Sequence, residues 1–348
     1  MRTGTYKESY SQLTALTDNP AVWLWACALI GALVVVPSIA NAYVLSLAST
    51  VCITALGVLG LNLLSGVAGQ ISLGHAAFLL IGAYAHAILM TDYGVNGFAS
   101  ILVSGFIAAL VSLVVGIPSL RLKGLYLAIT TLAFTFIAQH VVLYAEDITR
   151  GSAGMSVVPL DLLGFEFASE QRFFYVALGF LVLFVLITLN LMRTRIGRAW
   201  LALRDHDIAA RAMGINLTRY KLLAFMVSAF YGGVAGALIA AHTRYVNVDT
   251  FGVLVSIEAL AMIIVGGLGR THGAILGAAL IVLLPEVLRV AFAVLGSDVQ
   301  ALMADRIYEI RGMMYGVVIL LFLRLEPEGL AGIWRKSKRF WTQWPLSQ

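Results

Sequence analysis

The feature that most constrains the fold of this chain is a succession of apolar runs, each long enough to cross a lipid bilayer as a helix. A transmembrane helix needs about 20 apolar residues, and a helix in lipid satisfies its own backbone hydrogen bonds. Because 60% of the 348 residues are hydrophobic and 12% are charged, we expect an all-α integral membrane protein with about ten transmembrane helices. The expected spans are residues 21–40, 43–64, 70–90, 98–119, 124–144, 173–192, 222–242, 252–269, 272–296 and 309–325.

Positive charges occupy alternate loops between these runs, and this pattern gives the expected orientation. Lysine and arginine in short loops accumulate on the cytoplasmic side of a membrane. The loops in question carry Arg2 and Lys7, Arg121 and Lys123, the seven cations of residues 193–221, Arg270, and Arg335, Lys336, Lys338 and Arg339. Ten spans with both termini cytoplasmic place them all on that side. We expect a cytoplasmic segment at 1–20, a transmembrane domain at 21–325 that includes a cytoplasmic loop at 193–221, and a cytoplasmic tail at 326–348.

Other classes of protein are disfavoured by composition and by missing motifs. The net charge of +5 is explained by these loops, so we expect no nucleic-acid partner. The two cysteines, Cys27 and Cys52, lie in apolar runs and indicate neither a disulfide framework nor a metal site. The sequence contains no G-x-x-x-x-G-K-[ST] phosphate-binding loop and no nucleophile constellation. We therefore expect no catalytic residue and no cofactor bound by this chain.

The most polar stretch between two apolar runs is residues 193–225, with seven lysines or arginines against two acids. We expect a polar helix at 200–214, which Gly214 ends in a left-handed conformation. Thr218 is the expected N-cap of the span that follows. A short helix bounded in this way is typical of a docking element for a cytoplasmic partner. A solvated surface helix is the alternative.

A glycine-rich stretch at 60–78 contains polar side chains in apolar surroundings, namely Asn62, Gln70, Ser72 and His75. Polar side chains are costly in lipid, so we expect these to face the bundle interior or a solute pathway. The glycines would permit a break in the helix that exposes backbone groups. Alternatively, the stretch holds only a short turn, with Gln70 and Ser72 capping the next helix.

Three further residues are candidates for a solute pathway. Tyr126 and Thr130 lie one helical turn apart and therefore share a helix face. A threonine hydroxyl also bonds commonly to the carbonyl of the preceding turn, which is the alternative for Thr130. Glu258 lies inside an apolar run, where a carboxylate is a functional candidate by default. Snorkelling to the membrane surface, or pairing with a local partner, is the alternative for Glu258.

Four stretches together resemble the membrane permease subunits of ABC importers for branched-chain and other hydrophobic amino acids. They read GLNLLSGVAGQISLGHAAF, LRLKGLYLAITTLAF, IGRAWLALRDHDIAARAMGINLTRYKLLAFMVSAFYGGVAGAL and VGGLGRTHGAILGA, in this order within residues 60–280. The resemblance implies an ABC importer permease fold in the bacterial inner membrane. It also implies a transport subunit rather than an enzyme, which takes up branched-chain or other hydrophobic amino acids.

The resemblance further implies partners: a second permease subunit, two cytoplasmic ATPase subunits that bind ATP and Mg²⁺, and a periplasmic substrate-binding protein. Such permeases contact the ATPases through a motif of Glu-Ala-Ala, three residues and Gly. Ala209, Ala210 and Gly214 match this motif, whereas Ile208 replaces the glutamate. The candidate ATPase-coupling residues are Arg204, Asp205, Asp207, Ala209, Ala210, Arg211 and Gly214.

The alternative function is an ion- or proton-coupled secondary transporter of a small organic solute, with Glu258 as the coupling carboxylate. The two functions differ in what drives uptake. An ABC permease requires its ATPase partners, whereas a secondary transporter works alone on an ion gradient.

Labelling with a membrane-impermeant thiol reagent tests the expected orientation. In a background that lacks Cys27 and Cys52, Asp161→Cys is expected to react in intact cells, because its loop lies outside. Asp205→Cys is expected to react only after the membrane is permeabilised. The reverse pattern would exclude a chain with both termini in the cytoplasm.

Overall fold

The computed structural model describes residues 20–343, except residues 121, 123, 163, 164, 168, 296–306 and 327. Most of the described chain is helical, as expected from its apolar runs. The α-helices are α2 (Pro20–Ile39), α3 (Ala42–Leu61), α4 (His75–Thr91), α5 (Gly97–Ser119), α6 (Leu125–Tyr144), α7 (Glu146–Thr149), α8 (Glu170–Arg193), α9 (Arg195–Asp205), α10 (Asp207–Ala212), α11 (Leu217–Thr243), α12 (Val253–Gly266), α13 (Thr271–Leu295), α15 (Ile307–Leu325) and α16 (Gly329–Gln343). A π-helix η1 (Asn62–Val67) and 3-10 helices η2 (Gly151–Ala153) and η3 (Val248–Phe251) complete the helices of the described part. The expected segment at 1–20 lies outside the described residues except for Pro20.

Six segments of the described chain are long and apolar enough to cross a membrane. They are Ala42–Val67, Gly97–Ser119, Leu125–Tyr144, Glu170–Arg193, Leu217–Thr243 and Val248–Gly266. Three shorter apolar helical segments are His75–Thr91, Thr271–Val287 and Gly312–Phe322. The chain is therefore a multi-pass helical protein, and the count of ten spans stays a prediction.

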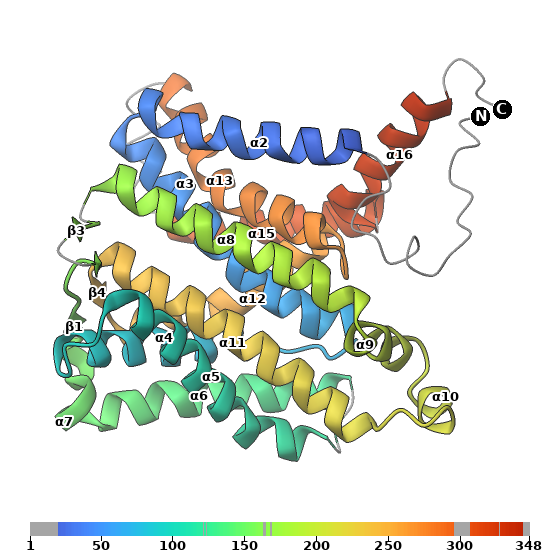
Figure 1. Cartoon of the computed structure of the whole chain (residues 1–348), viewed down its shortest axis with the longest axis horizontal. Coiled ribbons are helices and arrows are strands. Elements are labelled where there is room, and N and C mark those ends of the chain that lie inside the picture. The colour runs from blue at the N-terminus through green and yellow to red at the C-terminus, as the bar shows by residue number, and fades with distance from the viewer. Residues whose placement is uncertain are drawn as a thin grey trace.

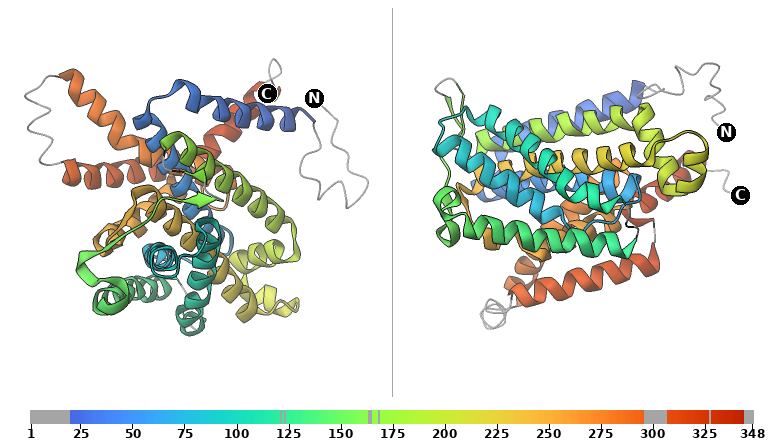
Figure 2. Two further views of the ribbon diagram at one scale, coloured as in Figure 1. Left: turned by 60° about the vertical axis from the view of Figure 1, so that its left-hand side comes forward. Right: turned by 90° about the horizontal axis from the view of Figure 1, so that it is seen from below.

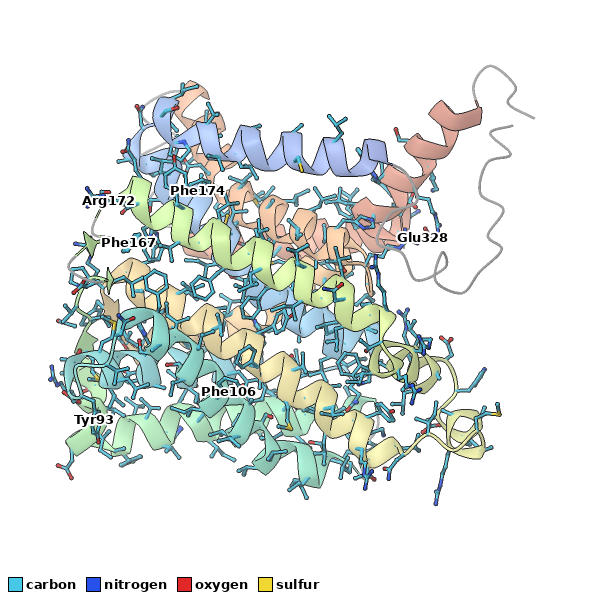
Figure 3. All side chains as sticks on the ribbon, viewed as in Figure 1. Tyr93, Phe106, Phe167, Arg172, Phe174 and Glu328 are labelled. Atoms are coloured by element: carbon cyan, nitrogen blue, oxygen red, sulfur yellow. The ribbon has the colours of Figure 1, made fainter. Side chains whose placement is uncertain are left out.

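The two ends of the helix bundle differ in structure (Figures 1 and 2). We call one the docking end: it carries α9, α10, α16 and the start of α2. At the opposite end, the strand end, β1 (Met155–Ser156) pairs antiparallel with β4 (Tyr245–Val246). There β2 (Asp161–Leu162) also pairs with β3 (Phe165–Glu166). Figure 3 shows Glu328 toward the docking end and Tyr93, Phe167 and Arg172 at the strand end.

The central helix of the bundle is α11, which packs against α3, α4 and α5 (Figure 1). Its glycines lie where neighbouring backbones approach most closely. A Cβ atom on Gly236 would lie 2.0 Å from the carbonyl oxygen of Leu79 in α4, and a Cβ on Gly82 would lie 2.1 Å from the carbonyl oxygen of Gly233. Small residues of this kind let membrane helices pack backbone to backbone, where no hydrophobic effect drives their association.

The polar loop at 193–221 forms two helices, so the expected single helix at 200–214 is wrong. α9 ends at Asp205, and His206 has an extended backbone with φ −154° and ψ 99°. α10 then begins at Asp207. A carboxylate in the first turn of a helix is stabilised by the helix dipole. Asp207 gains this stabilisation only because a new helix starts there.

The end of α10 follows one expectation and corrects another. Gly214 has a left-handed backbone with φ +84°, and the Ile215 N–H donates to the Ala210 carbonyl at 3.0 Å. This is the glycine stop that the sequence predicts. Thr218 is not the N-cap of α11, because the helix already begins one residue before it. The side chain of Asn216 caps α11 by accepting from the Arg219 N–H at 3.2 Å.

The expected tail at 326–348 contains a helix, α16, that our sequence analysis did not identify. Its first turns lie against the junction of α12 and α13, where Ala331 is fully buried and a Cβ on Gly267 would lie 3.1 Å from the Ala331 Cβ. Farther along, Trp334 and Arg335 are exposed. The tail is therefore attached to the membrane bundle at the docking end.

Candidate functional site

The glycine-rich stretch at 60–78 interrupts a helix inside the bundle. α3 continues as the π-helix Asn62–Val67, and the chain then runs without helical structure until α4 begins at His75. The expected span at 70–90 therefore starts five residues late. Most residues between Val67 and His75 are buried. We call residues 62–74 the break segment.

Hydroxyl groups from neighbouring helices satisfy the backbone of the break segment. The Leu73 N–H donates to the Thr131 hydroxyl of α6 at 2.9 Å, and the Thr135 hydroxyl donates to the Leu73 carbonyl at 3.3 Å. The Ala76 N–H donates to the Ser256 hydroxyl of α12 at 2.9 Å. An unsatisfied backbone group in lipid costs several kcal/mol. These hydroxyls therefore make the interruption possible.

The hydroxyls of Ser65 and Ser72 form hydrogen bonds within the break segment. Ser72 accepts from the Gly74 N–H at 3.2 Å. Neither Gln70 nor Ser72 is the N-cap of α4, because that position is held by Gly74, which has no side chain to cap the helix. Gln70 is buried, and its backbone carbonyl accepts from the Ser65 hydroxyl at 3.0 Å.

A cavity of about 300 Å³ lies between α3, α4, α11, α12, α13 and α15. It brings together two of the predicted pathway residues, His75 and Glu258, which are far apart in the sequence. Most of the wall is apolar and includes Ile53, Val255 and Met262. The cavity thus combines a carboxylate and an imidazole with an apolar wall.

His75 is held at this cavity by close contact with two glycines. A Cβ on Gly57 of α3 would lie 3.2 Å from the His75 Nε2, and a Cβ on Gly232 of α11 would lie 3.6 Å from the ring. The side chain is buried, and its Nδ1 atom has no hydrogen-bond partner among the described residues. A buried ring nitrogen without a partner is costly.

Glu286 is a second carboxylate of the cavity wall. Arg289 lies three residues along α13 and pairs with it at 2.6 Å. The hydroxyl of Tyr43 also donates to Glu286, and the Arg289 guanidinium lies 5.0 Å from the centre of the Tyr43 ring. The sequence does not point to Tyr43, because nothing local connects it to a residue more than 240 positions away.

The other pathway candidates lie elsewhere. Asn62 is at the opposite end of the break segment from His75, where its amide bonds to residues 269 and 270. Tyr126 is 73% exposed on the outside of the chain, and the Thr130 hydroxyl donates to the Tyr126 carbonyl at 2.9 Å. The structure thus does not bring Tyr126 and Thr130 to the cavity.

The docking end presents an apolar tip on a charged surface. Ile208 and Met213, at the two ends of α10, are 80% and 83% exposed, whereas Ala210 between them is buried. Beside them is a hollow of about 680 Å³, which is lined by Asp207, Arg211 and Gly214 among others. A partner would therefore meet the Ile208 and Met213 side chains rather than that of Ala210.

The remaining coupling candidates lie at the base of this tip. Arg204 and Asp205, at the end of α9, line a smaller hollow together with Gln70 of the break segment. The Arg204 guanidinium donates to the Gly66 carbonyl at 2.5 Å. Ala209 lies on the exposed side of α10. The described residues contain no group of three or more His, Cys, Asp and Glu side chains that would hold a metal ion.

Charged side chains also connect α16 to the loop that follows α12. Glu328 accepts a hydrogen bond from Arg335 and lies 3.7 Å from the Arg270 guanidinium. The hydrogen bond from Arg335 and the attraction of these cations hold the pKa of Glu328 below its ordinary value. Glu328 therefore stays ionised in the neutral pH range and keeps its contact with Arg270.

Comparison with known proteins identifies a family. Residues 43–323 match the sequence profile of the branched-chain amino acid transport system permease component. The high-affinity branched-chain amino acid transport system permease protein LivM of Salmonella typhimurium is 36% identical over 255 residues, and so is LivM of Escherichia coli. Each match covers 66% of this chain and 60% of the relative.

A second type of permease protein in the same transport systems is more distant. LivH of Salmonella typhimurium is 24% identical over 243 residues, which cover 64% of this chain and 77% of LivH. No solved structure matches the chain.

Two threonines one residue apart on α6 test the role of hydroxyls at the break segment. Thr131→Val is expected to lower the free energy of unfolding by about 1–3 kcal/mol, because it leaves the partly buried Leu73 N–H without an acceptor. Thr130→Val removes a hydroxyl that bonds to the Tyr126 carbonyl of its own helix. This variant is expected to change the free energy of unfolding by less than about 0.5 kcal/mol. Thermal unfolding in detergent measures both. Equal effects of the two variants would contradict this role.

Proposed function

This chain belongs to the family of permease components of branched-chain amino acid transport systems, and we propose that it is a permease subunit of an ATP-driven, binding-protein-dependent importer. The observation that carries the proposal is the family match over residues 43–323. We propose branched-chain or other hydrophobic amino acids as the substrates. The apolar wall of the cavity around His75 and Glu258 suits side chains of this kind.

The proposed setting is the bacterial inner membrane, with ten spans and both termini in the cytoplasm. Two observations support it. The segments α9, α10 and α16, which carry half of the exposed lysines and arginines among the described residues, lie at one end of the bundle (Figure 1). The start of α2 lies at the same end. Both agree with the positive-inside rule.

The proposed partners follow from the family. The similarity to both LivM and LivH supports a transporter with two permease subunits, of which this chain is one. We propose that the second permease completes the translocation pathway, and that two cytoplasmic ATPase subunits supply the ATP and Mg²⁺ chemistry. A periplasmic binding protein would deliver the substrate at the strand end.

We further propose that the cavity is part of the translocation pathway. Glu258 would attract the ammonium group of an amino acid, and the His75 ring, which lines the same cavity, would hydrogen-bond to its carboxylate. Ile53, Val255 and Met262 would surround the aliphatic side chain. Asn62, Gln70 and Ser72 would shape the break segment between the cavity and the docking end. Tyr126 and Thr130 lie on the outer face of α6, where a second permease would have to cover them.

Reconstitution in proteoliposomes tests the function. With the second permease, the ATPases and the binding protein present, we expect ATP-dependent uptake of radiolabelled leucine. Glu258→Gln is expected to lower uptake about tenfold, because a hydrogen bond to a charged group is worth about 1.5–3 kcal/mol. Glu146→Gln, an exposed change at the strand end, serves as control. Uptake by this chain alone on an ion gradient would favour a secondary transporter instead.

The exposed tip of α10 is the proposed contact with an ATPase subunit. Ile208→Asp is expected to reduce ATPase co-purification and binding-protein-stimulated ATP hydrolysis by about tenfold, because a desolvated, unpaired carboxylate costs several kcal/mol. Ile148→Asp makes the same change on an exposed isoleucine at the strand end and is expected to leave both unchanged. Normal hydrolysis in the Ile208 variant would show that the tip does not bind the ATPase.

A further inference from the structure

Two of the helices that line the cavity are α3 and α12. The interruption of α3 and the end of α12 both lie close to Arg204 of α9, and we call α9 and α10 the docking element. α3 passes into the break segment at Asn62, and α12 ends at Gly266. Arg204 of α9 contacts the break segment at Gly66 and lies next to Gly269, three residues after the end of α12. We propose that Arg204 is a positioning residue that transmits movement of the docking element to α3 and α12. This inference rests on the proposed function, because it concerns how ATP-driven movement reaches the cavity.

The first contact joins α9 to the break segment. The Arg204 Nη1 donates to the Gly66 carbonyl at 2.5 Å. Gly66 lies in the π-helix, and such irregular turns leave carbonyl groups available to other partners. A guanidinium is always charged and rigid, so it holds this carbonyl more firmly than a neutral donor would. The aliphatic part of Arg204 also packs on Gly69, where a Cβ would lie 3.1 Å from the Arg204 Cγ.

The second contact joins the break segment to the loop after α12. The amide of Asn62 makes two hydrogen bonds to this loop, accepting from the Gly269 N–H at 2.8 Å and donating to the Arg270 carbonyl at 3.3 Å. A single side chain thus satisfies both a donor and an acceptor of the loop. Any displacement of the π-helix therefore acts on the end of α12 as well.

A direct contact between two glycines makes this junction stiff. A Cβ on Gly66 would lie 2.4 Å from the Gly269 backbone nitrogen, and a Cβ on Gly269 would lie 2.7 Å from the Arg204 Nη1. The two backbones and the guanidinium therefore touch with no room for a side chain. Closely packed groups transmit displacement rather than absorb it.

The cavity residues are carried by the elements that meet at this junction. Gly57 of α3, which lies close to His75, is nine residues before Gly66, and Glu258 is two turns before the end of α12. A shift of Arg204 that pulls Gly66 and Gly269 would thus displace both walls of the cavity together. Arg204 needs no contact with the substrate for this role.

The test compares transport with ATP hydrolysis in the reconstituted complex. Arg204→Ala is expected to lower the leucine transported per ATP hydrolysed about tenfold, the effect of losing one hydrogen bond to a charged group, while the ATPases still co-purify. Arg204→Lys keeps a cationic donor and is expected to restore part of this ratio. Arg198→Ala removes a guanidinium from the same helix that donates to the Arg193 carbonyl, and is expected to leave the ratio unchanged.

Hydrogen exchange supplies a measurement that needs no substrate. In the Arg204→Ala variant, the Gln70 and Gly269 amides, which donate to Leu64 and Asn62, are expected to exchange faster than in Arg198→Ala. An unchanged transport ratio together with unchanged exchange would overturn the inference. Loss of ATPase co-purification in Arg204→Ala, with unchanged exchange, would also overturn it by making Arg204 a partner contact. Failure of the unmodified complex to transport leucine would instead count against the proposed function.

Discussion

The structure depends on how the chain satisfies backbone groups where a helix is interrupted inside the helix bundle. Residues 62–74 are not α-helical, and in lipid each unpaired backbone group costs several kcal/mol. The hydroxyls of Thr131, Thr135 and Ser256 supply the missing partners. Because they come from α6 and α12, the interruption fixes the positions of these two helices relative to α4. The cavity at His75 is formed where the interruption ends.

Close backbone packing around α11 supports this arrangement from the other side. Contacts such as that between Gly236 and Leu79 bring α11 and α4 together at a distance that no larger residue allows. The same principle operates at the docking end, where Gly66 touches Gly269. Small residues thus replace hydrophobic driving force as the means of joining membrane helices. They also leave little free space between the helices that connect the docking element to the cavity.

Much of this protein follows from local sequence pattern. The apolar runs predict the positions of the long helices, because a helix in lipid depends mainly on its own length and composition. Gly214 ends α10 as expected, since the left-handed turn is a local property of glycine. The pair of Glu286 and Arg289 is likewise local, being one helical turn apart. The split at His206 was missed, because a good helical pattern continues through it.

The candidate site could be predicted only in part, as a set of polar residues in apolar runs. The sequence singled out His75 and Glu258, yet only the packing of α4 against α12 places them in one cavity. The bond between Arg204 and Gly66 joins residues 138 positions apart, and no spacing rule connects them. The sequence by itself determined which segments are apolar helices and where turns stop them. Tertiary structure decided which polar groups meet, because such contacts depend on how separate helices pack.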